Sequence, residues 1–146
     1  MRRFTPPEAL FIDTWGWLSL ADARDPGHAQ AVSERRARTA PGSLITSDYV
    51  LDETFTRLFS RVAFAQARKF SDAILIASSG GQVGIERITP DRFDAAYKLR
   101  IRYRDKPEIS FTDLTSFVVM RELGLKQVLT ADAHFTQVQL GFLRVP

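Results

Sequence analysis

Short apolar segments alternate with longer segments of helical periodicity along most of this chain, and this alternation restricts the folds open to it. The apolar segments are residues 9–13, 43–46, 82–88, 127–130 and 141–145. Helical patterns occupy residues 25–38, 47–62, 64–78, 90–105 and 112–123, and a short helix is expected after residue 132. Because parallel strands need long crossover connections, usually helices, this order predicts an α/β fold with a central parallel sheet.

Several boundaries of these elements have local signals of their own. Thr89 followed by Pro90 is a strong helix start, because threonine caps a first turn and proline suits its first position. Pro26 suits the first turn of the helix expected from Asp25, and Gly124 suits the end of the helix over 112–123. No repeat, low-complexity tract or long linker interrupts the pattern, so we expect one domain over residues 1–146.

Composition excludes several kinds of chemistry. The 146 residues contain no cysteine, which excludes a disulfide framework, a thiolate zinc site and a cysteine nucleophile. Two arginines near the N-terminus are followed by no long apolar stretch, so we expect no signal peptide. No apolar run is long enough to span a membrane. We therefore expect a cytoplasmic protein without a membrane partner.

Basic side chains gather in two short stretches, although the net charge is only +3. The clusters are Arg35, Arg36 and Arg38, and Lys98, Arg100, Arg102 and Arg104. Such runs are usually solvated faces, and they indicate contact with a polyanion only if they flank a catalytic pocket.

Acidic side chains follow two of the predicted strands. Asp13 comes directly after Leu10-Phe11-Ile12, and Asp132 comes just beyond Val128-Leu129-Thr130. Asp113 lies in the first turn of one predicted helix and Glu53 early in another. In open parallel sheets, ligands bind beyond the carboxyl ends of the strands, so these acids can meet at one rim. A group of carboxylates of this kind suits Mg²⁺ or Mn²⁺.

Electrostatics makes this hypothesis testable. Two carboxylates 5 Å apart repel by roughly 3 kcal/mol at an effective dielectric near 20, so four together need a cation between them. Such a metal lowers the pKa of an attacking water and stabilises charge on a phosphoryl oxygen. Taken singly, each acid has a simpler explanation. Asp13 and Asp132 can each cap the helix that follows. Asp113 can interact favourably with the dipole of its helix, and Glu53 can face solvent.

Four segments together resemble the PIN-domain family, and most of all the VapC-type toxins of bacterial toxin–antitoxin pairs. The segments are Phe11-Ile12-Asp13-Thr14, Tyr49-Val50-Leu51-Asp52-Glu53-Thr54, Ser110-Phe111-Thr112-Asp113 and Leu129-Thr130-Ala131-Asp132-Ala133-His134-Phe135. They follow the family's order and cover nearly the whole chain. No single segment is specific, whereas four in sequence are.

The resemblance implies a three-layer α/β/α sandwich and a metal-dependent endoribonuclease that hydrolyses RNA phosphodiester bonds with Mg²⁺ or Mn²⁺. Asp13, Glu53, Asp113 and Asp132 take the acidic positions, with Asp13 and Asp113 as the expected direct ligands and the other two acting directly or through water. Thr14, Ser110 and Thr130 match small polar positions that orient carboxylates or water. The resemblance also implies a homodimer and a cognate antitoxin protein that enters the acidic groove.

Two residues depart from the common pattern of the family. Trp15 stands where many relatives have a small or polar residue, and its ring either packs in the core or stacks on a base. His134 stands where many members have a further aspartate; it either touches phosphate and balances charge or is a plain surface histidine. The competing hypothesis is a PIN-fold module that binds RNA or protein without cutting, and the presence of all four acids argues against it.

Overall fold

The computed structural model describes residues 8–146, and in this part of the chain five parallel strands form one sheet in the order β3-β2-β1-β4-β5. The strands are β1 (Leu10–Ile12), β2 (Leu44–Ser47), β3 (Val83–Glu86), β4 (Gln127–Leu129) and β5 (Leu143–Val145). The helices are α1 (Thr14–Ala21), α2 (His28–Arg36), α3 (Asp48–Arg61), α4 (Phe64–Ser79), α5 (Pro90–Arg102), α6 (Phe111–Leu123) and α7 (His134–Gln137). The predicted α/β fold with a central parallel sheet is confirmed. The N-terminal arginines used in the signal-peptide argument lie outside the described residues.

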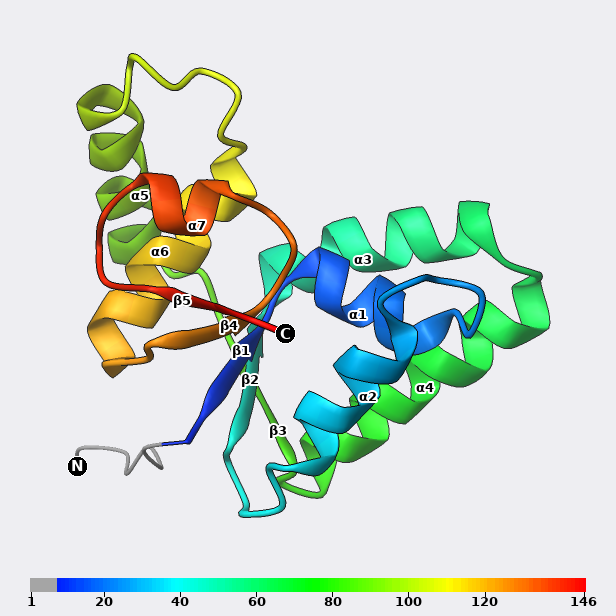
Figure 1. Ribbon diagram of the computed structural model, residues 1–146. Coiled ribbons are helices and arrows are strands. Elements are labelled where there is room, and N and C mark those ends of the chain that lie inside the picture. The colour runs from blue at the N-terminus through cyan, green and yellow to red at the C-terminus, as the bar shows by residue number, and fades with distance from the viewer. Residues whose placement is uncertain (1–7) are drawn as a thin grey trace.

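Helices cover both faces of this sheet. Helices α1–α4 lie on one side and α5–α7 on the other, which gives the three layers that the family resemblance implied (Figure 1). None of the helices within residues 8–146 is long and apolar enough to cross a membrane.

Strand β1 is the point where the order of the sheet reverses. It pairs with β2 on one side and with β4 on the other, and the chain leaves β1 towards β2 but leaves β4 towards β5. Connections that run in opposite directions from neighbouring parallel strands leave a crevice beyond their carboxyl ends. The topology therefore directs any binding site to the ends of β1 and β4.

Two N-terminal elements differ from the prediction. Helix α1 has no counterpart among the predicted helices, because six of its eight residues are buried and no polar face marks a helical period. Helix α2 begins at His28 rather than near Asp25, because the Asp25 carboxylate accepts a hydrogen bond of 2.8 Å from the backbone of Gly27 and forms a turn. The predicted cap at Thr89 and the left-handed Gly124 that ends α6 are both confirmed.

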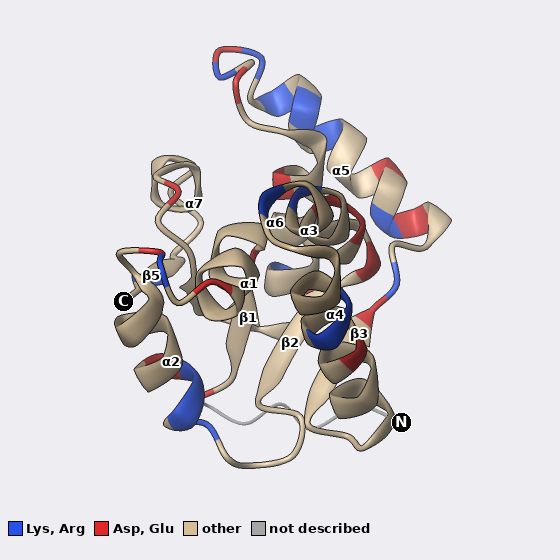
Figure 2. Ribbon diagram, turned by 90° about the vertical axis from the view of Figure 1, so that its right-hand side faces the viewer, with Lys and Arg blue, Asp and Glu red and all other residues tan. Residues whose placement is uncertain are grey.

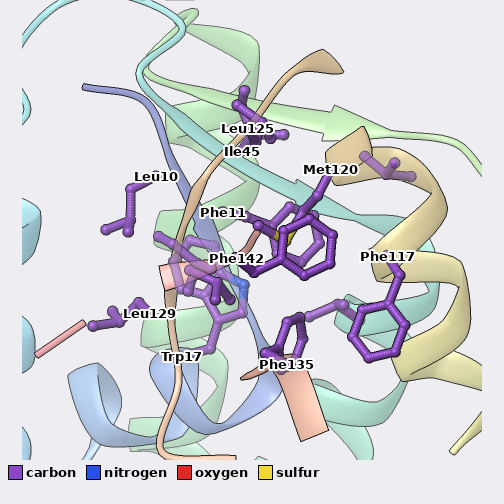
Figure 3. Close-up of a cluster of buried hydrophobic side chains, with 14 of the residues drawn as sticks. Leu10, Phe11, Trp17, Ile45, Phe117, Met120, Leu125, Leu129, Phe135 and Phe142 are labelled. Carbon is purple, nitrogen blue, oxygen red and sulfur yellow. The ribbon is translucent and has the colours of Figure 1, made fainter. Parts of the chain in front are cut away.

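The core beneath the ends of β1 and β4 is aromatic (Figure 3). Phe117 on α6 meets Phe135 on α7 edge to face, with ring centroids 5.0 Å apart, and Phe142 lies 5.7 Å from Phe117. On the other face, Trp17 of α1 donates a hydrogen bond of 3.0 Å from Nε1 to Thr46 Oγ1, and Thr46 donates to the carbonyl of Ile12. These contacts fix α1 and α7 against the strands from which the acidic loops emerge.

Gly16 allows α1 to approach β4 closely, and we predict that Gly16→Ala destabilises the protein. An added Cβ would lie 2.6 Å from the carbonyl oxygen of Leu129 and 3.0 Å from Ile12 Cγ2, so backbone must shift. We expect a loss of about 1–3 kcal/mol in the free energy of unfolding, measured by urea denaturation. Gly80→Ala is the matched control, because its Cβ would meet only the flexible end of Gln82. Equal stability of the two variants would contradict this account of the α1–β4 contact.

Candidate active site

Asp13 and Asp132 are joined through one threonine. Thr130 follows β4 and donates a hydrogen bond of 3.0 Å from Oγ1 to Asp13 Oδ2, while the same oxygen accepts a hydrogen bond of 3.0 Å from the backbone of Asp132. Asp13 occupies the N-cap position of α1, but its side chain makes no capping hydrogen bond. The helix-cap explanation for Asp13 is therefore wrong, and its carboxylate faces the crevice between β1 and β4.

Asp113 reaches the same crevice from α6. Ser110 caps this helix by accepting a hydrogen bond of 3.0 Å from the backbone of Asp113, which sets the carboxylate in the first turn. His134 lies between the acids, with Nδ1 3.4 Å from Asp113 Oδ2 and 3.1 Å from Asp132 Oδ1. The backbone of His134 also donates to Asp132 Oδ1 at 2.8 Å. His134 is therefore no plain surface histidine, since it orients two of the predicted acids.

Glu53 forms the outer wall of the cluster. It projects from α3, accepts a hydrogen bond of 3.3 Å from Thr14 Oγ1, and lies 3.8 Å from a guanidinium nitrogen of Arg57 one helical turn later. The half-buried side chain thus points to the crevice as well as to solvent. The amphipathic pattern indicated either solvent or an open groove, and Glu53 lines the groove while it remains partly exposed to solvent.

All four predicted acids line one pocket of about 390 Å³. Thr14, Ser110 and His134 line it too, and Thr130 is buried beside it against Asp13. Arg57 and Glu108 also line the pocket with charged side chains, and neither was predicted as a site residue. Arg57 could have been found from its spacing of four residues from Glu53, whereas nothing around Glu108 marks it.

The predicted basic clusters lie elsewhere on the described chain. None of their members lines the acidic pocket. Arg38 pairs with Glu34, and Arg100 donates to the carbonyls of Tyr103, Lys106 and Ile109, so both stabilise local structure. The other basic residues of the two clusters lie at the end of α2 and along and just after the second half of α5, where Figure 2 colours the ribbon blue.

Burial and mutual repulsion raise the pKa of Asp13 and of Asp113, the two most buried of the four acids. Burial, helped by the charge on Asp113, raises the pKa of Asp13 to about 7, against the hydrogen bond from Thr130. Burial and the charge on Asp132 raise the pKa of Asp113 to about 6, although the contact with His134 opposes this. Because the ionised forms of these carboxylates are disfavoured, a bound cation would stabilise them.

The donor set fits a hard divalent ion. Ligand atoms of Asp113, Asp132 and His134 lie within 4.8 Å of one another, and Asp13 is joined to Asp132 through Thr130. Carboxylate oxygens suit Mg²⁺ and Mn²⁺, and an imidazole is tolerated best by the transition metal.

Comparisons with known proteins agree with this geometry. Residues 10–140 match the PIN domain family, and the chain belongs to that family. It is 34% identical over 136 residues to the 23S rRNA-specific endonuclease VapC20 of Mycobacterium tuberculosis, covering 93% of this chain and 97% of the relative.

Solved structures show the same relationship. The crystal structure of M. tuberculosis VapC20, described as a toxin that cleaves the sarcin-ricin loop, superposes with a TM-score of 0.79 at 30% identity over 92% of this chain and 97% of the other. VapBC2 from Rickettsia felis, bound to a DNA fragment from its promoter, has a TM-score of 0.65 at 12% identity over 93% and 96%, which shows a shared fold.

Asp13→Asn should stabilise the metal-free protein at alkaline pH. Because the folded pKa of Asp13, about 7, exceeds the ordinary value of 3.8, the folded state binds the extra proton, and stability falls as pH rises from about 4 through 7. The asparagine carries no such charge, so we expect the free energy of unfolding to rise by about 4 kcal/mol at pH 8 and to change little near pH 4. Denaturant titrations in the presence of chelator measure the free energy of unfolding at each pH, and Asp52→Asn, at an exposed residue, is the control. A gain that does not depend on pH would contradict the assigned cause.

Proposed function

We propose that this protein is a metal-dependent endoribonuclease and the toxin of a toxin–antitoxin pair. The observation that carries the proposal is the convergence of Asp13, Glu53, Asp113 and Asp132, from four separate elements, in one pocket at the switch point of a PIN fold. Identity of 34% to an enzyme named as a ribosomal RNA endonuclease supports the same reaction.

Each side chain has a distinct part in this proposal. Asp13 and Asp113 would hold Mg²⁺ or Mn²⁺ directly, and Asp132 and Glu53 would hold it directly or through water. When bound, the ion makes water a better nucleophile and stabilises charge on the phosphoryl oxygens. Thr130, Ser110 and Thr14 orient the carboxylates through the hydrogen bonds described above, and His134 sets Asp132. Arg57 supplies a cation on the pocket wall that can face the RNA backbone.

RNA is the proposed substrate, and ribosomal RNA is the first candidate because the related VapC20 is named for 23S rRNA. With such a substrate, the proposed site of action is the cytoplasm. The proposed partner is a cognate antitoxin, as the name VapBC2 of the Rickettsia complex suggests for that relative. An antitoxin arginine entering the pocket would form charge-assisted hydrogen bonds with carboxylates that otherwise need a metal.

Asp113→Asn should abolish metal-dependent RNA cleavage. We expect purified protein to cut total RNA in Mg²⁺ or Mn²⁺ but not in chelator, and the variant to lose about 100-fold or more in rate because a metal ligand is removed. Gel electrophoresis and mapping of the new RNA ends measure cleavage and separate ribosomal from transfer RNA targets.

Asp52→Asn is the matched control, since Asp52 adjoins Glu53 in sequence but is exposed and does not line the pocket. It should cut RNA at the wild-type rate. Calorimetric titration with Mn²⁺ separates the competing hypotheses, because a binding module without catalysis would leave RNA intact. Cleavage that survives both chelator and Asp113→Asn would overturn the proposed enzyme.

Helix α5 offers support for the proposed homodimer. Phe93, Tyr97 and Ile101, spaced four residues apart, are 44%, 58% and 53% exposed, although the ring of Phe93 also packs on Phe111 of α6, the helix that the inner face of α5 contacts. Asp91 and Asp94 lie beside the first half of this α5 stripe, together with Arg92, which is paired with Glu86 and Glu122, and basic residues lie beside the second half (Figure 2). An antiparallel pair of α5 helices centred near Tyr97 would set Asp94 beside Lys98 of the second copy. This self-complementary pattern is what a two-fold interface requires.

Tyr97→Asp should therefore produce a monomer. A charge at the centre of the α5 stripe would be buried without a partner, which weakens an apolar interface strongly. Sedimentation velocity measures the change. Ile76→Asp is the control, because Ile76 is 71% exposed on α4 and lies off the stripe. If the dimer tolerates Tyr97→Asp but not Ile76→Asp, the interface lies on α4 instead of α5.

A further inference from the structure

A second pocket, of about 500 Å³, lies beside the acidic pocket at the same edge of the sheet. Trp15 and Ala131 line both pockets, so the two share a wall. The second pocket is completed by residues that follow β4, by the C-terminal strand β5 and by the beginning of α2. Its volume is within the range of sites that hold small planar ligands.

The two tryptophans of α1 have different environments. Trp17 is 3% exposed and its indole nitrogen is bonded to Thr46, which accounts for it as a core residue. Trp15, two residues earlier, points to a different side of the helix and is only half-buried. Its six-membered ring lies against Gly27, where an added Cβ would come within 2.9 Å of Cζ2. The ring therefore packs against Gly27 on one side and lines both pockets.

The chemistry of the second pocket contrasts with that of the first. Five carboxylates line the acidic pocket, whereas none of the described residues lining the second pocket is acidic. Instead it combines the aromatic ring of Trp15 with neutral hydrogen-bonding side chains, Gln30 and Thr136. One cation, Arg144, is anchored there by a hydrogen bond of 2.9 Å from its guanidinium to the carbonyl of Ala131. Flat apolar faces with polar edges and no net charge are the features of a nucleobase.

We propose that this pocket binds one unpaired base of the RNA, next to the phosphate that is cut, with Trp15 stacked on it. The inference rests on the proposed ribonuclease function, and it adds a subsite that selects the substrate. Proteins that recognise RNA by sequence mostly read unpaired bases, which they stack on aromatic rings and bond along the edges. A base held here leaves the neighbouring phosphate at the acidic pocket, because the two pockets meet at Trp15 and Ala131.

Tryptophan fluorescence tests the pocket without any cleavage. The chain has two tryptophans, so Trp17→Phe leaves Trp15 as the single reporter and Trp15→Phe leaves Trp17. In chelator, short homopolymeric oligoribonucleotides should quench Trp15 but not Trp17, and an abasic ribose-phosphate chain of equal length should quench neither. Equal quenching by the abasic chain, or no response of Trp15 to any of the four homopolymers, overturns the proposal.

A second experiment uses the cleavage reaction. Trp15→Leu should slow cutting about 5- to 150-fold, the range that stacking of one base on an aromatic ring provides. Removing the base beside the cut phosphate should slow the wild-type enzyme by a similar factor, and should slow Trp15→Leu no further. Trp15→Phe should recover much of the rate, which a merely structural role would not predict. Phe64→Leu, at an exposed aromatic residue off both pockets, is the control.

If Trp15→Leu and removal of the base slow cleavage independently, so that their factors multiply, the base-binding role is overturned even though the protein still cleaves RNA. Failure of every RNA to be cut would instead refute the ribonuclease, and the fluorescence titration would still decide whether the pocket binds a base.

Discussion

The hydrogen bond from Thr130 to Asp13 joins the carboxyl ends of β1 and β4, and the geometry of the acidic pocket depends on it. These strands are neighbours in the sheet although Asp13 and Thr130 are 117 residues apart in the chain. Because the same oxygen receives the backbone of Asp132, one hydroxyl sets the position of two carboxylates. The parallel pairing of β1 with β4 fixes the distance between them, and the loops need only hold the side chains inward.

Holding these carboxylates together opposes the stability of the fold. Burial raises the pKa of both Asp13 and Asp113, so the protein without a cation tends to retain protons on groups that a metal would need ionised. The carboxylate oxygens of the pocket could bind either a divalent ion or an arginine from a partner. The ion would be coordinated by these oxygens, and the arginine would donate hydrogen bonds to them. In the proposed function, activity and inhibition would then depend on whether a metal ion or an arginine of the partner occupies this pocket.

Much of this arrangement follows from the sequence, for reasons that differ between residues. Asp13 and Asp132 were predictable because each ends an apolar strand, and parallel strands present their carboxyl ends at one edge. Glu53 could not be assigned from its helix alone, since an outward face is compatible with solvent or with a groove. Helix α1 was not predicted, because a helix that is buried on most sides lacks the regularly spaced polar residues that mark an amphipathic helix. Glu108 lies in a loop whose path is set by tertiary packing, and no local pattern places it in the pocket.

The first turn of α1 connects the acidic pocket to the neighbouring pocket, whose described lining contains no carboxylate side chain. Asp13 faces the cluster of acids, Thr14 bonds Glu53 across it, and Trp15 stands between the two pockets. The approach of α1 to β4 at Gly16 brings this turn against the loop containing Thr130 and Ala131. A shift of α1 would therefore move Asp13, a proposed metal ligand, together with the ring of Trp15. The groups proposed for chemistry and for base selection would then keep a constant separation. A rigid spacing of this kind would let the protein choose which phosphate of an RNA loop is cut by recognising the base beside it.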